Sequence, residues 1–128
     1  FVNAFAANDP KSTLQIWNML EYRIGDRSTC IFLNTRSDRR YRTKQLINLV
    51  FNEIQPDLFI VRGDDLPKEL HELNDDHKNI EMKIFSENAT SDQIFNYFST
   101  IESQFIMGIG NIVGWGESFV SELKEYRI

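Results

Sequence analysis

The stretch TCIFLNTRSDRRYRTKQLINLVFNEIQPDLFIV, residues 29–61, decides the fold. It opens with one apolar run of strand length, Thr29 to Leu33, and closes with another, Leu58 to Val61. Between them, apolar residues recur at three- and four-residue steps from a possible cap at Thr43 until Pro56, which predicts an amphipathic helix. Two continuous apolar strands joined by such a helix favour a parallel βαβ unit, because the crossover helix covers the strands.

The rest of the chain repeats this alternation. Further strands are expected at residues 1–5, 80–85 and 105–109. Further helices are expected from the Asn8-Asp9-Pro10 cap to Gly25, from Asp65-Leu66-Pro67 to a polar turn at residues 74–78, from a capping box at Thr90 to Gln93, and from Phe119 to the end of the chain. We therefore predict one three-layer α/β domain over residues 1–128, with a mostly parallel sheet of about five strands and helices on both faces.

The composition is that of a globular protein with an acidic balance. Of the 128 residues, 41% are hydrophobic and 26% charged, and the formal net charge is −5. The apolar runs are far shorter than the roughly 18 residues of a membrane span, so we expect the chain not to cross a bilayer. A single cysteine excludes an internal disulfide, and with only two histidines the inventory rules out a structural Cys/His zinc site.

The most informative loop follows the second strand. Ligands bind at the carboxyl ends of parallel strands, and here residues 35–44 carry five cations and one Asp, a local charge of +4. Guanidinium groups beside free backbone N–H groups at a helix start suit phosphate or carboxylate. We predict an anion site there, with a solvated run of charge as the alternative. The acidic isoelectric point, near 5.0, argues against nucleic acid as the anion.

Two other loops combine small residues with short polar side chains. Residues 6–10, Ala-Ala-Asn-Asp-Pro, either only cap the next helix or also let Asn8 and Asp9 orient a ligand. Residues 108–117 hold four of the six glycines, so the backbone there is expected to pass close to a ligand or to another part of the protein. Gly108 and Gly110 do not complete the three-glycine dinucleotide fingerprint, and a tight loop under Trp115 is the alternative to a ligand site.

Several common catalytic arrangements are missing from the sequence. It contains neither a Gly-x-x-x-x-Gly-Lys-Ser/Thr phosphate loop nor a Gly-x-Ser-x-Gly elbow. Cys30 lies in an apolar strand and is expected in the core, whereas His71 and His77 lie in a polar stretch and are expected at the surface. Asp64 and Asp65 could touch a metal, although helix capping explains Asp65 as well.

Three segments together resemble a known family. They are Asn3 to Leu14, Asn34 to Arg39 and Gly108 to Gly116, and they resemble the ligase subunit of poly-γ-glutamate synthase, the CapB or PgsB type of capsule protein. The resemblance covers the whole chain. More distantly, the arrangement is similar to the C-terminal domain of Mur ligases and folylpolyglutamate synthases, which share a Rossmann-like α/β fold.

The resemblance implies an ATP-dependent amide ligase that polymerises glutamate into poly-γ-glutamate. In such enzymes ATP phosphorylates a carboxylate to an acyl phosphate, and the amine of a glutamate unit attacks it. ATP and Mg²⁺ would be held mainly by a central domain with a phosphate loop. This chain would be the C-terminal domain that closes over the site, a fragment of a longer enzyme that is inactive alone.

The resemblance also implies partners and a location. The partners would be glutamate or polyglutamate, the other domains of the same chain and other subunits of a bacterial capsule synthase complex. That complex would lie in the cytoplasm at the inner face of the cell membrane, held there through its other subunits.

Site residues follow from the same resemblance. Asn8 and Asp9 stand where the wider Mur group has a polar loop facing the nucleotide, and Asp38 with Arg39 stand where it has an acidic-basic pair in its substrate loop. Three more residues, Gly108, Gly110 and Asn111, match the last glycine-rich turn of that group, which lies near these two loops. With the basic loop, the predicted substrate or nucleotide contacts are Asn8, Asp9, Arg36, Asp38, Arg39, Arg40, Arg42, Gly108, Gly110 and Asn111.

Two other kinds of function remain open at this point. One is a stand-alone anion- or nucleotide-binding module of doubly wound type. A phospho-receiver is disfavoured within that class, because the first strand ends in Phe5-Ala6-Ala7 and not in acidic residues. The other is a scaffold that binds subunits through exposed aromatic residues such as Trp115 and Tyr126, which would show a large apolar patch and no anion affinity.

Overall fold

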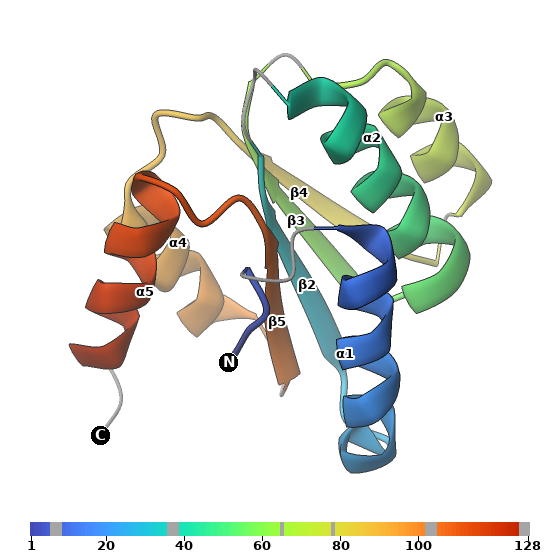
Figure 1. Ribbon diagram of the computed structural model, residues 1–128, viewed down its shortest axis with the longest axis horizontal. Helices are drawn as coiled ribbons and strands as arrows, with labels where there is room; N and C mark the ends of the chain where they lie inside the picture. Colours follow the sequence, from blue (N-terminus) through green and yellow to red (C-terminus); the bar gives the residue numbers. More distant parts are fainter. Residues whose placement is uncertain (6–8, 36–38, 65, 78, 102–104, 126–128) are drawn as a thin grey trace.

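The chain folds around one parallel sheet. The computed structural model describes residues 1–5, 9–35, 39–64, 66–77, 79–101 and 105–125. Its five strands are β1 (Val2–Asn3), β2 (Thr29–Asn34), β3 (Leu58–Arg62), β4 (Glu81–Phe85) and β5 (Phe105–Gly110). They lie in the order β1-β5-β2-β3-β4, and every neighbouring pair is parallel (Figure 1). The predicted α/β class and parallel sheet are confirmed.

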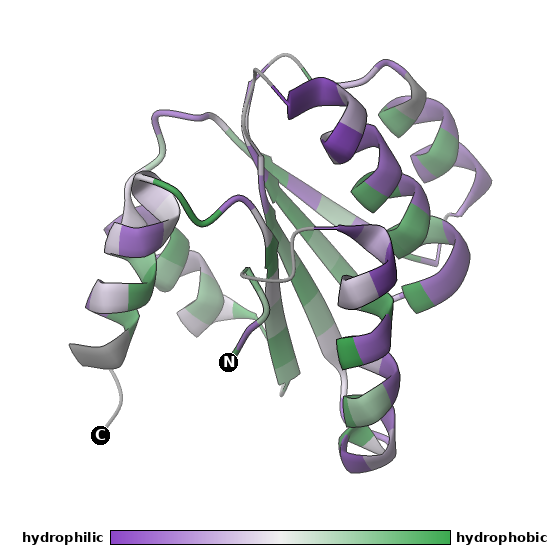
Figure 2. Cartoon of the chain, viewed as in Figure 1, coloured by the Kyte–Doolittle hydropathy of each residue, from purple (hydrophilic) through white to green (hydrophobic). Residues whose placement is uncertain are grey.

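Helices cover both faces of the sheet (Figure 1). One face carries α1 (Pro10–Ile24), α2 (Arg40–Leu49), its π-helical continuation η2 (Val50–Ile54), and α3 (Glu69–Asp76). The other face carries α4 (Ser91–Thr100) and α5 (Trp115–Glu125). The central strands are hydrophobic along their length, while the helices alternate hydrophobic and hydrophilic residues (Figure 2). This is the pattern expected where crossover helices bury both sides of a sheet.

Alternate residues of β2 enter two separate cores. Ile31 and Leu33 join the cluster under α1, α2 and α3, whereas Cys30 and Phe32 join the cluster under α4 and α5. Phe119 of α5 lies at the centre of the second core, with its ring stacked 4.9 Å from that of Phe95 and 5.0 Å from that of Trp115. Burying one such side chain contributes about 1.5–3 kcal/mol, so these clusters supply the main stabilisation of the fold.

Of the five predicted helix starts, those of α1 and α4 are confirmed and that of α2 is wrong. The structure also begins α3 at Glu69, after residues 65–67, and α5 at Trp115, one turn before Phe119. The Asp9 carboxylate accepts the Ser12 N–H at 2.9 Å and caps α1. Thr90 and Gln93 form the predicted capping box of α4. Thr43 does not cap α2: it is buried inside the helix, which begins one turn earlier at Arg40. The intervening Arg-Tyr-Arg turn is compatible with helix, so the element extends toward the basic loop.

Other boundaries differ because tertiary packing sets the ends of elements. Strand β1 is shorter than the predicted residues 1–5, and β4 is an edge strand on which Ile84 remains 40% exposed. Helix α3 lies less in water than expected, since Leu70 is only 1% exposed. His71 is exposed as predicted, whereas His77 is half-buried with its ring centroid 5.5 Å from that of Phe51.

Cys30 is the core residue that the sequence predicted. It lies in β2, is fully buried, and burial raises the pKa of its thiol to about 12. Because only the thiolate is nucleophilic, the folded chain should be nearly inert toward alkylating reagents at ordinary pH.

We predict that iodoacetamide at pH 8 alkylates Cys30 about a thousandfold more slowly in the folded chain than in urea-unfolded chain, because almost no thiolate forms in the core. Mass spectrometry of timed samples measures both rates. Comparable rates in the two states would mean that β2 opens to solvent far more often than a central strand should.

Candidate functional site

The carboxyl ends of β2 and β5 mark a switch in the topology. The strands are paired up to Asn34 and Gly110, but the helix that follows β2 lies on one face of the sheet and the helix that follows β5 lies on the other (Figure 1). Chains that leave adjacent strands toward opposite faces open a crevice between them, and doubly wound proteins bind ligands there. The fold therefore places the candidate site at this point.

A pocket of about 70 Å³ lies in the crevice. It is lined from three segments: Leu33, Asn34 and Thr35 at the end of β2; Gly110, Asn111 and Val113 after β5; and Arg39, Arg42, Thr43 and Leu46 at the start of α2. The buried leucines make its inner part apolar, while Arg39 is exposed and Arg42 half-buried. Such a lining suits a small anionic group with a short apolar neighbour.

Two asparagines hold the mouth of the pocket in shape. The Asn34 side-chain Nδ2 donates to the Asn111 carbonyl at 2.9 Å, and the Asn111 N–H donates to the Asn34 carbonyl at 2.8 Å. The Asn111 side chain in turn bonds both backbone groups of Val113. Gly110, the residue before Asn111, has a φ of 96°, and a Cβ there would stand 2.7 Å from Cδ1 of Leu33. Only glycine fits that close, left-handed position.

Arg62, at the end of β3, organises this edge of the sheet. Its side chain is 6% exposed. Nε donates to the Ala89 carbonyl at 3.1 Å, Nη1 donates to Asn34 Oδ1 at 3.0 Å, and Nη2 donates to the Glu87 carbonyl. Because the Asn34 oxygen accepts from Arg62, its amide nitrogen is directed to Asn111. The arginine thereby sets the orientation of a pocket-lining side chain.

The Arg62 guanidinium also packs on an aromatic ring. Its Cζ lies 3.8 Å from the centre of the Trp115 ring, a cation–π contact that is worth about 2 kcal/mol when desolvated. Burial lowers the pKa of Arg62, and the nearby carboxylates of Glu87 and Asp64 oppose this effect. Trp115 is half-buried, stacked on Phe119 and covered by this cation, so the expectation of an exposed Trp115 as a docking residue is wrong.

The amino end of α1 lies within electrostatic reach of the same pocket. Hydrogen bonds from Ser12 lower the pKa of the Asp9 carboxyl, and the positive charge of Arg42 lowers it further. The Asp9 carboxylate therefore attracts Arg42 electrostatically, in addition to capping the helix. Asp9 of the first predicted loop and Arg42 of the second thus lie within electrostatic reach of each other.

The structure brings together part of the predicted contact set. Arg39, Arg42, Gly110 and Asn111 line the pocket, and Asp9 lies within electrostatic reach of Arg42. Three other predicted contacts, Asn8, Arg36 and Asp38, lie outside the described residues.

Two predicted contacts lie away from the pocket lining. Gly108 is inside β5, where a Cβ would stand 2.6 Å from ring atoms of both Phe1 and Phe5, so the close approach that its glycine permits is to the core. Arg40 lines a separate groove on the other side of α2. Helical geometry explains this, because at 100° per residue Arg40 lies on a different side of α2 from Thr43 and Leu46, which line the pocket.

Sequence reasoning missed the two residues that position the pocket. Asn34 and Arg62 are each a polar residue at the end of an otherwise apolar strand, and both are buried. That pattern is the available signal, because a polar group is kept in the core only where hydrogen bonds satisfy it. The atoms that bond Asn34 and Arg62 come from segments that are distant in the sequence, so this hydrogen-bond network could not be predicted from the sequence.

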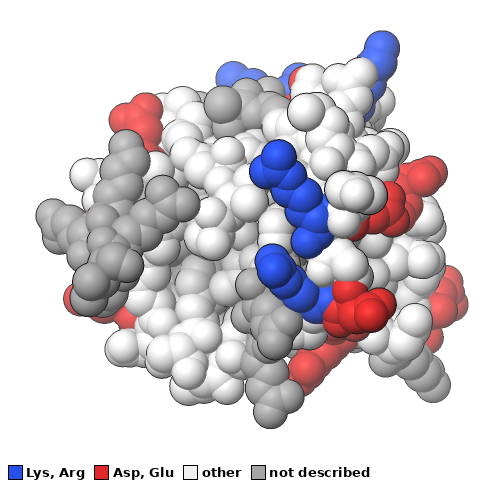
Figure 3. Space-filling view, turned by 90° about the horizontal axis from the view of Figure 1, so that it is seen from below, with Lys and Arg blue, Asp and Glu red and all other residues white. Residues whose placement is uncertain are grey.

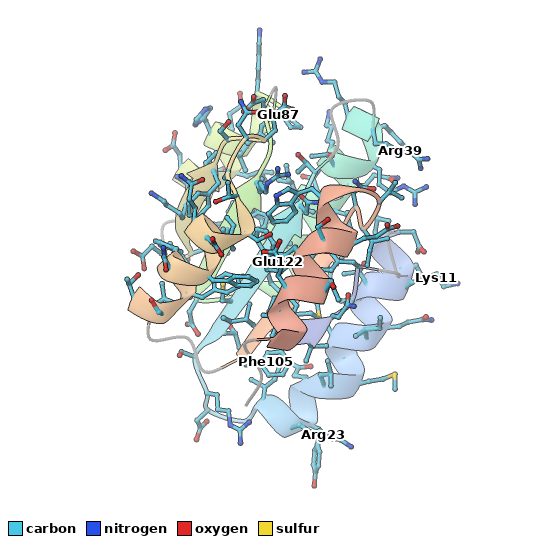
Figure 4. The ribbon with its side chains drawn as sticks, turned by 90° about the vertical axis from the view of Figure 1, so that its left-hand side faces the viewer. Lys11, Arg23, Arg39, Glu87, Phe105 and Glu122 are labelled. Carbon is cyan, nitrogen blue, oxygen red and sulfur yellow. The ribbon has the colours of Figure 1, made fainter. Side chains whose placement is uncertain are left out.

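Charged residues lie at both ends of the molecule (Figure 3 and Figure 4). Arg39 and Glu87 lie at the carboxyl end of the strands, whereas Arg23 lies at the opposite end (Figure 4). On that opposite end, basic and acidic side chains lie next to one another (Figure 3). Within the described part of the chain, no three His, Cys, Asp or Glu side chains are grouped to hold a metal, and no helix is long and apolar enough to span a membrane.

Comparison with known proteins identifies the family. The family model described as the poly-gamma-glutamate synthase CapB C-terminal domain matches residues 1–126. The chain belongs to this family. The pocket at the β2–β5 switch point is therefore a feature of a CapB C-terminal domain, and the resemblance seen in the sequence is confirmed.

Two curated relatives are considerably longer. The chain is 30% identical over 132 residues to PGA synthase CapB of Bacillus subtilis (strain 168), and it covers 33% of that protein. It is 29% identical over 141 residues to capsule biosynthesis protein CapB of Bacillus anthracis, and it covers 28% of that protein. Both alignments use all of this chain, which thus spans about a third of its curated relatives.

A solved structure shares the fold. It is a domain attributed to a UDP-N-acetylmuramate:L-alanyl-gamma-D-glutamyl-medo-diaminopimelate ligase from Haemophilus ducreyi. The two chains superpose with a TM-score of 0.55 at 13% identity, over 97% of this chain and 87% of that one. The CapB C-terminal domain and this Mur-type ligase domain therefore have the same Rossmann-like architecture.

We predict that replacing Arg62 with Met lowers the free energy of unfolding by about 3 kcal/mol, because the methionine leaves the Asn34, Ala89 and Glu87 oxygens without their donor. Urea denaturation of the chain measures the change. Arg62→Lys should recover only part of it, since one ammonium cannot reproduce the planar set of donors.

The matched control is Arg23→Met, which removes an exposed arginine from the far end of the molecule. It should change the unfolding free energy by no more than about 0.5 kcal/mol. An Arg62→Met chain as stable as this control would contradict the organising role of the network.

Proposed function

We propose that this chain is the C-terminal, substrate-closing domain of an ATP-dependent amide ligase that polymerises glutamate into poly-γ-glutamate. The observation that carries the proposal is the pocket with Arg39 and Arg42 at its rim, at the topological switch point of a CapB C-terminal domain. The lengths of the curated relatives support the view that residues 1–128 act as one part of a longer enzyme.

The proposed reaction forms an amide in two steps. In the first step a carboxylate oxygen attacks the terminal phosphorus of ATP, which gives an acyl phosphate and ADP. The amine of a glutamate unit then attacks the acyl carbon, the carbon–oxygen bond to phosphate breaks, and inorganic phosphate leaves as the amine loses its proton. Every participant other than the attacking amine carries negative charge, so the enzyme needs cations to bring the reactants together.

The pocket is suited to hold the glutamate that supplies the amine. Arg39 and Arg42 can pair with a carboxylate that does not react, through parallel N–H donors. The apolar side chains of Leu33 and Val113 suit the methylenes of the same molecule. Holding the carboxylate fixes the direction of the amine, and such positioning is a large part of catalysis when two reactants must meet.

The charge of the pocket favours binding of the nucleotide's metal by the rest of the enzyme. The charged side chains that line it are arginines, which attract phosphate or carboxylate and repel Mg²⁺. We propose that this domain contributes at most a contact to a phosphate of ATP, and that the phosphate loop and magnesium ligands lie outside this chain. Water would be excluded when the two parts close over the acyl phosphate.

The proposed partners follow from the same role. They are glutamate or growing polyglutamate, the remaining domains of the chain and the other subunits of a capsule synthase. Attachment of the complex to the inner face of the membrane would be through those subunits.

We predict that Arg39→Ala in the full-length protein lowers ATP-dependent incorporation of labelled glutamate by about ten- to a hundredfold, the cost of one charge-assisted interaction with a bound anion. Most of the loss should appear as a higher KM for glutamate if the arginine holds it equally before and during reaction. Incorporation into polymer is measured at several glutamate concentrations.

Arg23→Ala is the control, because it removes the same charge from the opposite end of the domain. It should leave incorporation within about twofold of the wild type. Wild-type incorporation by the Arg39→Ala enzyme would remove this pocket from the mechanism. Glutamate binding without any ATP-dependent incorporation by the full-length wild type would favour the stand-alone anion-binding module instead.

A further inference from the structure

A second hollow lies on the other side of α2. It has a volume of about 320 Å³ and is lined by Arg40, Tyr41 and Lys44 of α2 and by Pro67 and Lys68 at the turn before α3. None of these five residues is acidic, and Arg40, Tyr41, Lys44 and Lys68 are all exposed. We call this hollow the α2–α3 groove. Its lining residues come from α2 and from the turn before α3. These two helices are neighbours on the same face of the sheet (Figure 1).

The groove and the pocket are two sides of one helix. Arg39, Arg42, Thr43 and Leu46 turn toward the pocket, and residues 40, 41 and 44 turn toward the groove. At 100° per residue these two sets point in nearly opposite directions. The first turn of α2 contains no acidic residue, so its cations are placed against the helix dipole at a cost in stability. A ligand with several negative charges would offset that cost on both sides.

We propose that the α2–α3 groove is a second binding site for a polycarboxylate chain, which passes over the start of α2 from the pocket. This inference rests on the proposed function, in which the pocket holds one glutamate unit and the polymer extends away from it. The groove would then hold carboxylates of units that have already been joined, and it would keep the growing chain on the enzyme between additions.

The lining fits a polymer of glutamate better than nucleic acid. Arg40, Lys44 and Lys68 offer cations on both walls, and Tyr41 and Pro67 add apolar groups to the lining. Poly-γ-glutamate alternates carboxylates with methylene-rich backbone, so both features have a counterpart. Single-stranded nucleic acid is bound by several stacking aromatics, and this groove supplies only Tyr41 in an acidic protein of net charge −5.

The test uses the full-length protein and one cation from each wall, in the variant Lys44→Gln/Lys68→Gln. Binding of poly-γ-glutamate oligomers of defined length is measured by fluorescence anisotropy at low and moderate salt. We expect affinity for long oligomers to fall about tenfold, from the loss of two charge contacts, and the salt dependence to become shallower. The KM for free glutamate should change less than about twofold, because the pocket is untouched.

Arg23→Gln/Arg27→Gln is the matched control, with the same change of net charge at exposed positions outside the groove. It should bind oligomers like the wild type. Equal weakening in both double variants, or unchanged affinity in the groove variant, would overturn the proposal. A DNA oligonucleotide that binds the wild type as tightly as the glutamate oligomer, and is lost equally in the groove variant, would overturn it in favour of a nucleic-acid site.

Failure of this inference is distinguishable from failure of the proposed function. If the full-length wild type adds glutamate to polymer but the groove variant binds oligomers normally, only the groove assignment falls. If the wild type adds no glutamate, the ligase proposal falls, and the oligomer-binding comparison still decides whether the groove holds a polycarboxylate.

Discussion

A single buried cation connects the segments that meet at the carboxyl edge of the sheet. Arg62 extends from β3, bonds the side chain of Asn34 on β2 and the backbone of the β4–α4 connection, and lies against Trp115 at the start of α5. Burying a guanidinium is costly, and the cost is met because each donor that it uses has an oxygen acceptor and the charge rests on a π face. The orientation of Asn34, the path of the loop after β5 and thus the mouth of the pocket all depend on this arrangement.

The topology of the sheet places the cations of the α2 start beside the crevice. Because the chain leaves β2 and β5 toward opposite faces, a crevice opens between them, and the first turn of α2 borders it. A cluster of cations lies at this helix start although the protein is acidic overall and the helix dipole disfavours positive charge there. Since helical residues point in all directions around the axis, one short basic stretch supplies both the pocket and the α2–α3 groove. The proposed handling of one glutamate unit on one side and joined units on the other follows from that geometry.

The fold could be predicted from the sequence to a large extent. Apolar runs such as residues 29–33 and 58–61 have one compatible structure when amphipathic helices separate them, and local caps such as Thr90 with Gln93 act within a few residues. The start of α2 was misplaced because Thr43 has the chemistry of a cap, whereas the Arg-Tyr-Arg turn before it is also compatible with helix and extends the element. The short β1 and the exposed edge strand β4 also depend on neighbours that are distant in the sequence.

The candidate site was predictable only in part. That Arg39, Arg42, Gly110 and Asn111 belong to one region follows from a rule about strand ends, which the sequence pattern can invoke. Gly108 could not be told apart from Gly110, because only the packing of Phe1 and Phe5 places the first in the core.

By itself the amino-acid sequence determined the α/β class, the family and the location of the basic loop, since each depends on residue type and local spacing. The tertiary structure alone decided that Arg62 is the organising residue, that Trp115 is covered and that the cations divide between two hollows. Those outcomes depend on which atoms meet across the sheet, and hydrogen bonds and ring contacts act only over such short distances.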